Sequence, residues 1–207
     1  MRSCSITWQK EQAEQDAVPR QADDYTTALE ITPECAHRIA IVLSLYVEVE
    51  HGLAPILSWT TGLTLDQAQA ALALQKQNAR KVLFLKGVCE QISPEWPRDV
   101  IAGKLFAQAI QAGNRIRNKY AHATYVSGGT PDAELLYVAV FADTAIGEEI
   151  ATVEILDSEI HYMKSLIVAM HNYIAARAAN APVNLREIED VVANAPQPFL
   201  RPSGNSD

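Results

Sequence analysis

The sequence predicts a mainly α-helical protein, an up-down bundle of four to five helices with an inserted β-hairpin. Gly and Pro are sparse in the middle of the chain, where long stretches rich in Ala, Leu, Gln and Lys favour helices. Apolar residues in these stretches recur at helical spacing, which is typical of helices that share one core. Only the segment at about 134–156 departs from this pattern, because it is rich in residues that favour strands.

The first element that we expect to pack is a helix beginning at Thr32-Pro33. Residues 1–31, which precede it, are polar and weakly patterned, and we interpret them as an N-terminal arm. A hydroxyl side chain caps a helix, and proline fits the first helical position, so this dipeptide predicts a helix start. Gly52 and Pro55 are expected to end or kink the helix.

Two further helices are predicted before the most polar segment of the chain. Residues 64–67 fit a capping box, with threonine first and glutamine fourth, and predict a helix that runs to about Ile92. Ser93-Pro94 then interrupts the pattern, and the third helix is expected at about 98–120.

The hairpin follows, with strands expected at 135–141 and 150–156. Because an isolated hairpin is marginally stable in water, we expect it to pack on the helices or on a partner. A fourth helix is predicted from Asp157-Ser158 to about Ala179, and a short fifth helix at 182–193.

The chain length of 207 residues favours one domain, which we place at 32–193. Residues 194–207, rich in Pro, Ser, Gly and Asn, are interpreted as a disordered tail. The longest apolar run, 39–47, falls short of the roughly 18–20 residues of a membrane span, and no secretory signal is visible. The three cysteines lack CxxC spacing, so neither a disulfide framework nor a zinc site is expected. These features predict a cytoplasmic protein without a membrane partner.

The net charge of −8 argues against a general nucleic-acid coat, but the charge is uneven. Residues 64–122 contain nine basic and four acidic residues, a net charge of +5, whereas the rest of the chain carries −13. A local basic surface on an acidic protein fits a confined phosphate site. The alternative is a solvated helix face with no binding role.

Residues 115–125 concentrate two arginines, an asparagine, a lysine and a histidine at the end of the third predicted helix. Arginine matches phosphate oxygens, and histidine transfers protons near neutral pH. On an ideal helix Arg115, Asn118 and His122 share one face, so Asn118 would orient His122. Arg117 lies about 140° around the axis from His122, and would reach it only if the helix ends near Ala121 or another chain completes the site.

The six residues from Arg117 to His122 resemble the Arg-Asn-x-x-Ala-His form of the HEPN superfamily motif. Members of that superfamily carry Arg-x(4–6)-His late in a helix of an all-α bundle. The helix pattern extends the resemblance loosely over 33–179. Arg115 also satisfies the spacing, but the asparagine that follows Arg117 favours Arg117 as the motif arginine.

This resemblance implies a metal-independent endoribonuclease, or an RNA- or nucleotide-binding protein, that needs no cofactor and works as a homodimer with both motifs at one cleft. Such a ribonuclease leaves a 2′,3′-cyclic phosphate and a 5′-hydroxyl. The implied catalytic residues are Arg117, Asn118 and His122, and the implied substrate-binding residues are Arg115, Lys119 and Tyr125.

HEPN toxins that pair with nucleotidyltransferase antitoxins often carry Arg-x4-His-x-Tyr, whereas this chain has Thr124 there and its tyrosine one residue later. The resemblance therefore points to a toxin or defence system but leaves an antitoxin or regulatory partner open, together with the RNA substrate. It also leaves open whether the motif is active as an enzyme.

Other readings of the same residues stay open. Arg117 and His122 would also suit a cluster that caps the helix C-terminus, where the helix dipole favours basic residues. The whole domain would then be a non-catalytic interaction or assembly module of a defence or stress system. A Glu-x-x-His pair at Glu48 and His51 is typical of di-iron bundles, but the chain has no second copy, so we expect no metal.

Overall fold

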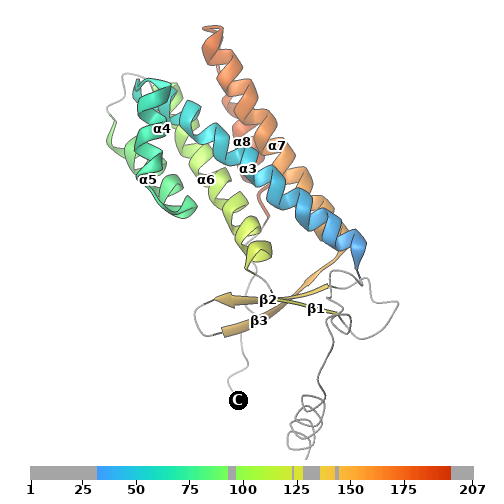
Figure 1. The fold of residues 1–207 in the computed structure, drawn as a ribbon. Coiled ribbons are helices and arrows are strands. Elements are labelled where there is room, and N and C mark those ends of the chain that lie inside the picture. Colours follow the sequence, from blue (N-terminus) through green and yellow to red (C-terminus); the bar gives the residue numbers. More distant parts are fainter. Residues whose placement is uncertain (1–31, 93–96, 123, 128–135, 143–144, 197–207) are drawn as a thin grey trace, which may run out of the picture.

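The computed structural model describes residues 32–92, 97–122, 124–127, 136–142 and 145–196, and this part of the chain is mainly helical, as predicted. The predicted arm at 1–31 and residues 197–207 of the predicted tail lie outside the described residues. Three long helices form the centre of the fold, and three shorter ones flank them (Figure 1). The long helices are α3 (Pro33–Thr61), α6 (Pro97–Ala121) and α7 (Val153–Ala178); the shorter ones are α4 (Leu65–Ala73), α5 (Asn78–Gln91) and α8 (Leu185–Ala193).

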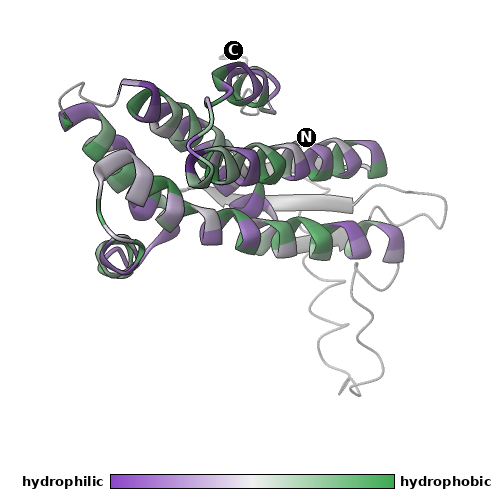
Figure 2. Ribbon diagram, turned by 90° about the horizontal axis from the view of Figure 1, so that it is seen from above, coloured by the Kyte–Doolittle hydropathy of each residue, from purple (hydrophilic) through white to green (hydrophobic). Residues whose placement is uncertain are grey.

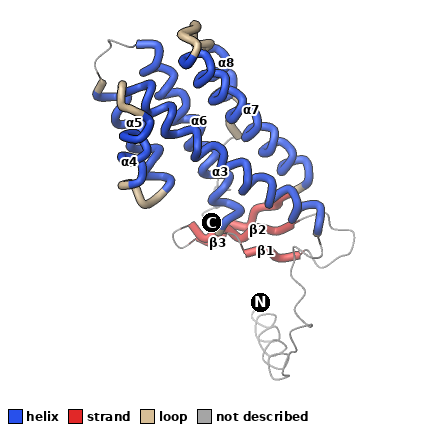
Figure 3. Tube along the Cα trace, turned by 45° about the horizontal axis from the view of Figure 1, so that its top comes forward, coloured by secondary structure: helices blue, strands red, loops and turns tan. Residues whose placement is uncertain are grey.

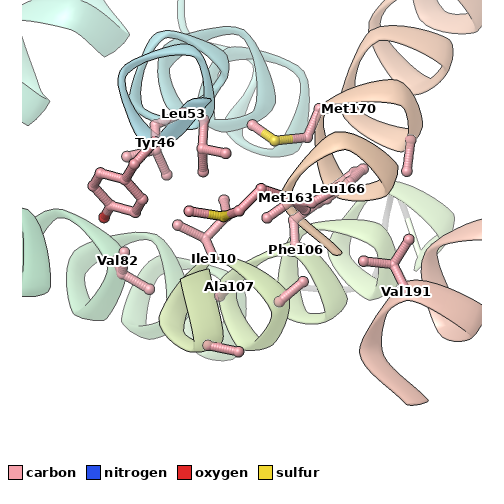
Figure 4. Close-up of a cluster of buried hydrophobic side chains, with 14 of the residues drawn as sticks. Tyr46, Leu53, Val82, Phe106, Ala107, Ile110, Met163, Leu166, Met170 and Val191 are labelled. Atoms are coloured by element: carbon pink, nitrogen blue, oxygen red, sulfur yellow. The ribbon is translucent and has the colours of Figure 1, made fainter. Parts of the chain in front are cut away.

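The core lies between α3, α6 and α7. Leu53, Ile110 and Met163, one from each of these helices, point toward one another and are almost fully buried (Figure 4). Burial of such a side chain contributes about 1.5–3 kcal/mol relative to leaving it exposed. Hydrophilic and hydrophobic residues alternate along the helical ribbons (Figure 2), as expected for helices that turn one side toward a shared core.

The first helix, α3, does not end at either of its predicted breakpoints. It continues through Gly52 and Pro55 to Thr61. Gly52 lies where α3 meets α7, and a Cβ atom there would come within 2.1 Å of the terminal methyl of Met170. Glycine at this position therefore allows the close approach of the two helices and does not break α3.

By length and composition α3 is also long and apolar enough to cross a membrane, alone among the described helices. The expectation concerned uninterrupted apolar runs, and the longest of these, 39–47, ends at Glu48 within α3. Ten of its residues are buried in the bundle, where the helix packs against α6 and α7. A central position in a protein core produces the same apolar composition.

The predicted helix at 64–92 is two helices in the structure. Its capping box is confirmed, because the Thr64 hydroxyl accepts from the Gln67 backbone N–H at 3.3 Å and the Gln67 side chain accepts from the Thr64 N–H at 3.0 Å. The helix then breaks at 74–77, since α4 packs on α3 whereas α5 packs mainly on α6. This break gives α5 an N-terminus of its own.

A three-stranded antiparallel sheet lies at one end of the bundle (Figure 3). Its strands, in the order β1-β2-β3, are β1 (Thr124–Ser127), β2 (Leu136–Ala142) and β3 (Ala145–Ala151). The sequence placed a strand at 150–156, five residues beyond the start of β3, and did not predict β1. Thr152 instead caps α7, with its hydroxyl accepting from the Ile155 N–H at 3.2 Å. The helix predicted from Asp157 therefore begins at Val153.

Candidate functional site

The end of α6 carries the polar motif. Ile116 and Tyr120 are buried, 5% and 2% exposed, and hold the last turns of the helix against the bundle. The helix ends at Ala121, so His122 is the first residue beyond it, although its backbone N–H still donates to the Asn118 carbonyl at 3.2 Å.

Arg117, Asn118 and His122 come together at this helix end. The Nη1 atom of Arg117 donates to Oδ1 of Asn118 at 2.9 Å and lies 3.4 Å from Nε2 of His122. A guanidinium has only donors, so a hydrogen bond between Arg117 and His122 requires Nε2 to be unprotonated, with the ring proton on Nδ1. The two side chains meet although an ideal helix would place them about 140° apart, and α6 ends one residue before His122. The Asn118 side chain, expected to orient His122, contacts Arg117 instead.

A cavity of about 410 Å³ opens in front of these side chains. Its other wall is formed by the connection from α4 to α5 and the first residues of α5. The lining residues are Lys76, Gln77, Asn78, Ala79, Asn114, Arg117, Asn118 and His122. Two of them are permanent cations, one is histidine, four carry side-chain amides, and none is acidic. In a protein with a net charge of −8, this acid-free lining is suited to an anion.

Asn114 forms the floor between the two walls. It is 7% exposed, and its Oδ1 accepts a hydrogen bond from the Tyr46 hydroxyl of α3 at 3.2 Å. Burial raises the pKa of Tyr46, with the charge of Glu50 acting in the same direction and that of Arg117 opposing it. Tyr46 therefore stays protonated and remains a donor to Asn114 over the physiological pH range.

Arg115 and Lys119 do not reach the cavity. Arg115 is exposed, and its charge acts on Tyr162 of α7, whose pKa is raised by burial and lowered in part by Arg115. Lys119 is 6% exposed, and its Nζ lies 3.4 Å from Oε1 of Glu159, also on α7. Neither residue lines this cavity, and the phosphate contacts expected of them stay a prediction.

Tyr125, the other residue expected to bind substrate, lies in β1, where its backbone pairs opposite Val138 of β2. Its side chain lies outside the part of the structure that is described.

The sequence did not predict the opposite wall of the cavity, residues 76–79. No local pattern marks it, because the break between α4 and α5 contains neither Gly nor Pro. The only available signal was the excess of basic residues over 64–122, to which Lys76 contributes.

A larger groove of about 900 Å³ lies between α7 and α8, away from the motif. Its lining mixes basic and acidic side chains, including Lys164, Arg186, Glu187 and Asp190, and so lacks a single preferred ligand charge. Within the described ranges, no group of three or more His, Cys, Asp and Glu side chains is placed to hold a metal ion.

Comparison with known proteins gives no match for this chain, whether with family models, curated proteins or solved structures.

Proposed function

We propose that the cavity at the end of α6 is the active site of a cytoplasmic, metal-independent endoribonuclease that resembles the HEPN superfamily. The observation that carries the proposal is the 3.4 Å contact between Arg117 and His122 in a cavity without acidic residues. A proton acceptor and a fixed positive charge beside each other are what cleavage of a phosphodiester requires.

In the proposed reaction the RNA phosphate binds to Arg117, and Nε2 of His122 removes the proton of the adjacent 2′-hydroxyl. The 2′-oxygen attacks phosphorus while the bond from phosphorus to the 5′-oxygen breaks. Arg117, held by Asn118 at 2.9 Å, stabilises the negative charge that develops on the phosphate oxygens. The products are a 2′,3′-cyclic phosphate and a 5′-hydroxyl.

The leaving 5′-oxygen also needs a proton, and the cavity contains one histidine. We propose that His122 of a second copy of the chain supplies this proton, with the two motifs at one cleft of a homodimer. An antitoxin or regulatory protein that covers this cleft would restrain the activity. Both partners follow from the resemblance and are part of the same proposal.

The test is incubation of end-labelled RNA with the purified full chain in excess EDTA. We expect cyclic-phosphate ends, about 10²–10⁴-fold slower cleavage by His122→Ala, and about 10²–10³-fold slower cleavage by Arg117→Gln. Arg115→Gln is the matched control. It removes the same charge at a position two residues before Arg117, where the side chain is exposed and lies outside the cavity. Equal loss in the control, or unchanged cleavage by His122→Ala, would refute the assignment.

The alternatives are separate outcomes of the same experiment. A wild-type protein that binds RNA at the cavity without cutting it is a binding protein with an inactive motif. If the wild type neither cuts nor binds diverse RNAs, and His122→Ala lowers the melting temperature, the cluster caps the end of α6. The domain is then a non-catalytic interaction module.

A further inference from the structure

The N-terminus of α5 opens into the candidate site. Gln77 at its N-cap makes no side-chain capping bond, and the first turn contains no acidic residue. The N–H groups of Arg80 and Lys81 donate to the Gln77 carbonyl at 2.9 and 3.1 Å, but those of Asn78 and Ala79 have no hydrogen-bond partner among the described residues. The positive end of the helix is therefore left uncompensated on the cavity wall.

A second, independent feature points into the same space. Asn114 is 93% buried and lines the cavity from α6. Its Oδ1 is engaged by the Tyr46 hydroxyl, whereas its Nδ2 donates to none of the described residues and stays accessible from the cavity. An amide N–H that opens into a cavity is a ready donor, so a ligand oxygen that accepts from Nδ2 would take the place of water there.

We propose that Lys76, the N-terminus of α5 and Asn114 form a second phosphate subsite beside Arg117 and His122, so that the cavity takes a nucleotide chain with at least two phosphates. The inference rests on the proposed function and names its substrate more narrowly. Lys76 supplies a mobile point charge, and the N–H groups of Asn78 and Ala79 supply oriented donors, which together suit phosphate oxygens. The cavity volume of about 410 Å³ falls in the range of about 300–1,000 Å³ usual for small-molecule sites.

Binding of a short 2′-O-methyl oligouridylate tests the subsite in the full-length protein. This ligand lacks the attacking hydroxyl and is not cleaved, so its binding is measured with Arg117 and His122 unmutated. We expect Lys76→Gln and Asn78→Asp each to weaken binding about tenfold. The slope of log affinity against log salt concentration is expected to fall by about 0.7 for Lys76→Gln, the value for one lost contact to a single strand.

Asn78→Asp separates binding from folding. A carboxylate in the first turn of α5 stabilises the helix but repels a phosphate, so the melting temperature is expected to stay equal or rise while affinity falls. Lys86→Gln is the matched control for Lys76→Gln. It removes a charge from the same region of the chain. Lys86 lies on an exposed face of α5, 3.9 Å from Glu90, and does not line the cavity.

Affinities of Lys76→Gln and Asn78→Asp equal to wild type, or an equal loss in Lys86→Gln, overturn the subsite. Inorganic phosphate is also tested as a competitor. If it displaces the oligonucleotide at a concentration as low as the one at which the oligonucleotide half-saturates the protein, the subsite is contradicted, because the site would then serve a free phosphate. Failure of the nuclease proposal looks different, since wild type would bind through Lys76 but leave cleavable RNA intact. If cleavage depends on His122 while Lys76→Gln leaves KM unchanged, the nuclease stands and the subsite falls.

Discussion

Replacing Lys119 by methionine tests how α6 is held against α7. Lys119 and Glu159 have side chains only 6% and 4% exposed and lie 3.4 Å apart, and the Tyr120 hydroxyl also donates to Glu159. Lys119→Met breaks this buried ion pair by removing one member, a change that destabilises a protein by about 3–5 kcal/mol. A shift of about 2–4 °C per kcal/mol, usual for a chain of this size, predicts a melting temperature lower by about 6–20 °C.

The assay is thermal and urea unfolding of wild type, Lys119→Met, Glu159→Gln and the double variant. The double variant is expected to recover part of the loss, because it removes both charges together. The reasoning is refuted if Lys119→Met changes the free energy of unfolding by less than about 1 kcal/mol. If that variant stays stable but binds RNA more weakly, Lys119 contacts phosphate after all, as the sequence predicted.

Three further outcomes are expected. Arg115→Gln is expected to leave the cleavage rate within about twofold of wild type, in contrast to Arg117→Gln, and a loss above about tenfold would return Arg115 to the site. Gly103→Ala is expected to lower the free energy of unfolding in urea by about 1–3 kcal/mol. The added Cβ would lie 2.7 Å from the Cys89 sulfur and 3.0 Å from the Thr60 hydroxyl. An unchanged urea midpoint would show that α5 and α6 move apart to relieve this contact. Burial raises the pKa of the Cys89 thiol to about 11, so mass spectrometry is expected to find it alkylated at pH 8 only after unfolding. Because this pKa is raised, the stability that the neutral thiol contributes is present below its unfolded pKa and is lost as the pH rises through about 11; rapid alkylation of folded protein would contradict its burial.

Local sequence signals predicted the long helices well and the connections poorly. The third helix was expected at 98–120 and spans Pro97–Ala121, because its apolar spacing reports directly on the buried face. The break at 74–77 has no such signal, since helix-favouring residues fill it and packing on two different neighbours causes it. The strand expected at 150–156 failed because residues with high strand propensity also fit the first turn of α7 once Thr152 caps it.

The candidate site divides in the same way. Its first wall, Arg117 to His122, is a contiguous motif and was visible in the sequence. Helical periodicity favoured Arg115 as the neighbour of His122, whereas in the structure Arg117 lies 3.4 Å from the His122 ring at the end of α6. The second wall comes from Lys76, about 40 residues earlier, and only the tertiary packing of α5 on α6 brings it near.

The contrast between the acid-free cavity and the acidic chain has a consequence for the speed of encounter. At low ionic strength, near 0.01 M, the field of a protein with a net charge of −8 extends over a Debye length of about 30 Å and repels an approaching polyanion before the cavity attracts it. Salt shortens this outer repulsion to about 8 Å at physiological strength, whereas contacts within the partly buried cavity are screened less. Moderate salt therefore speeds the association of a polyanion with the protein, whereas higher salt weakens its contacts in the cavity. The rate of productive association passes through a maximum as the salt concentration rises.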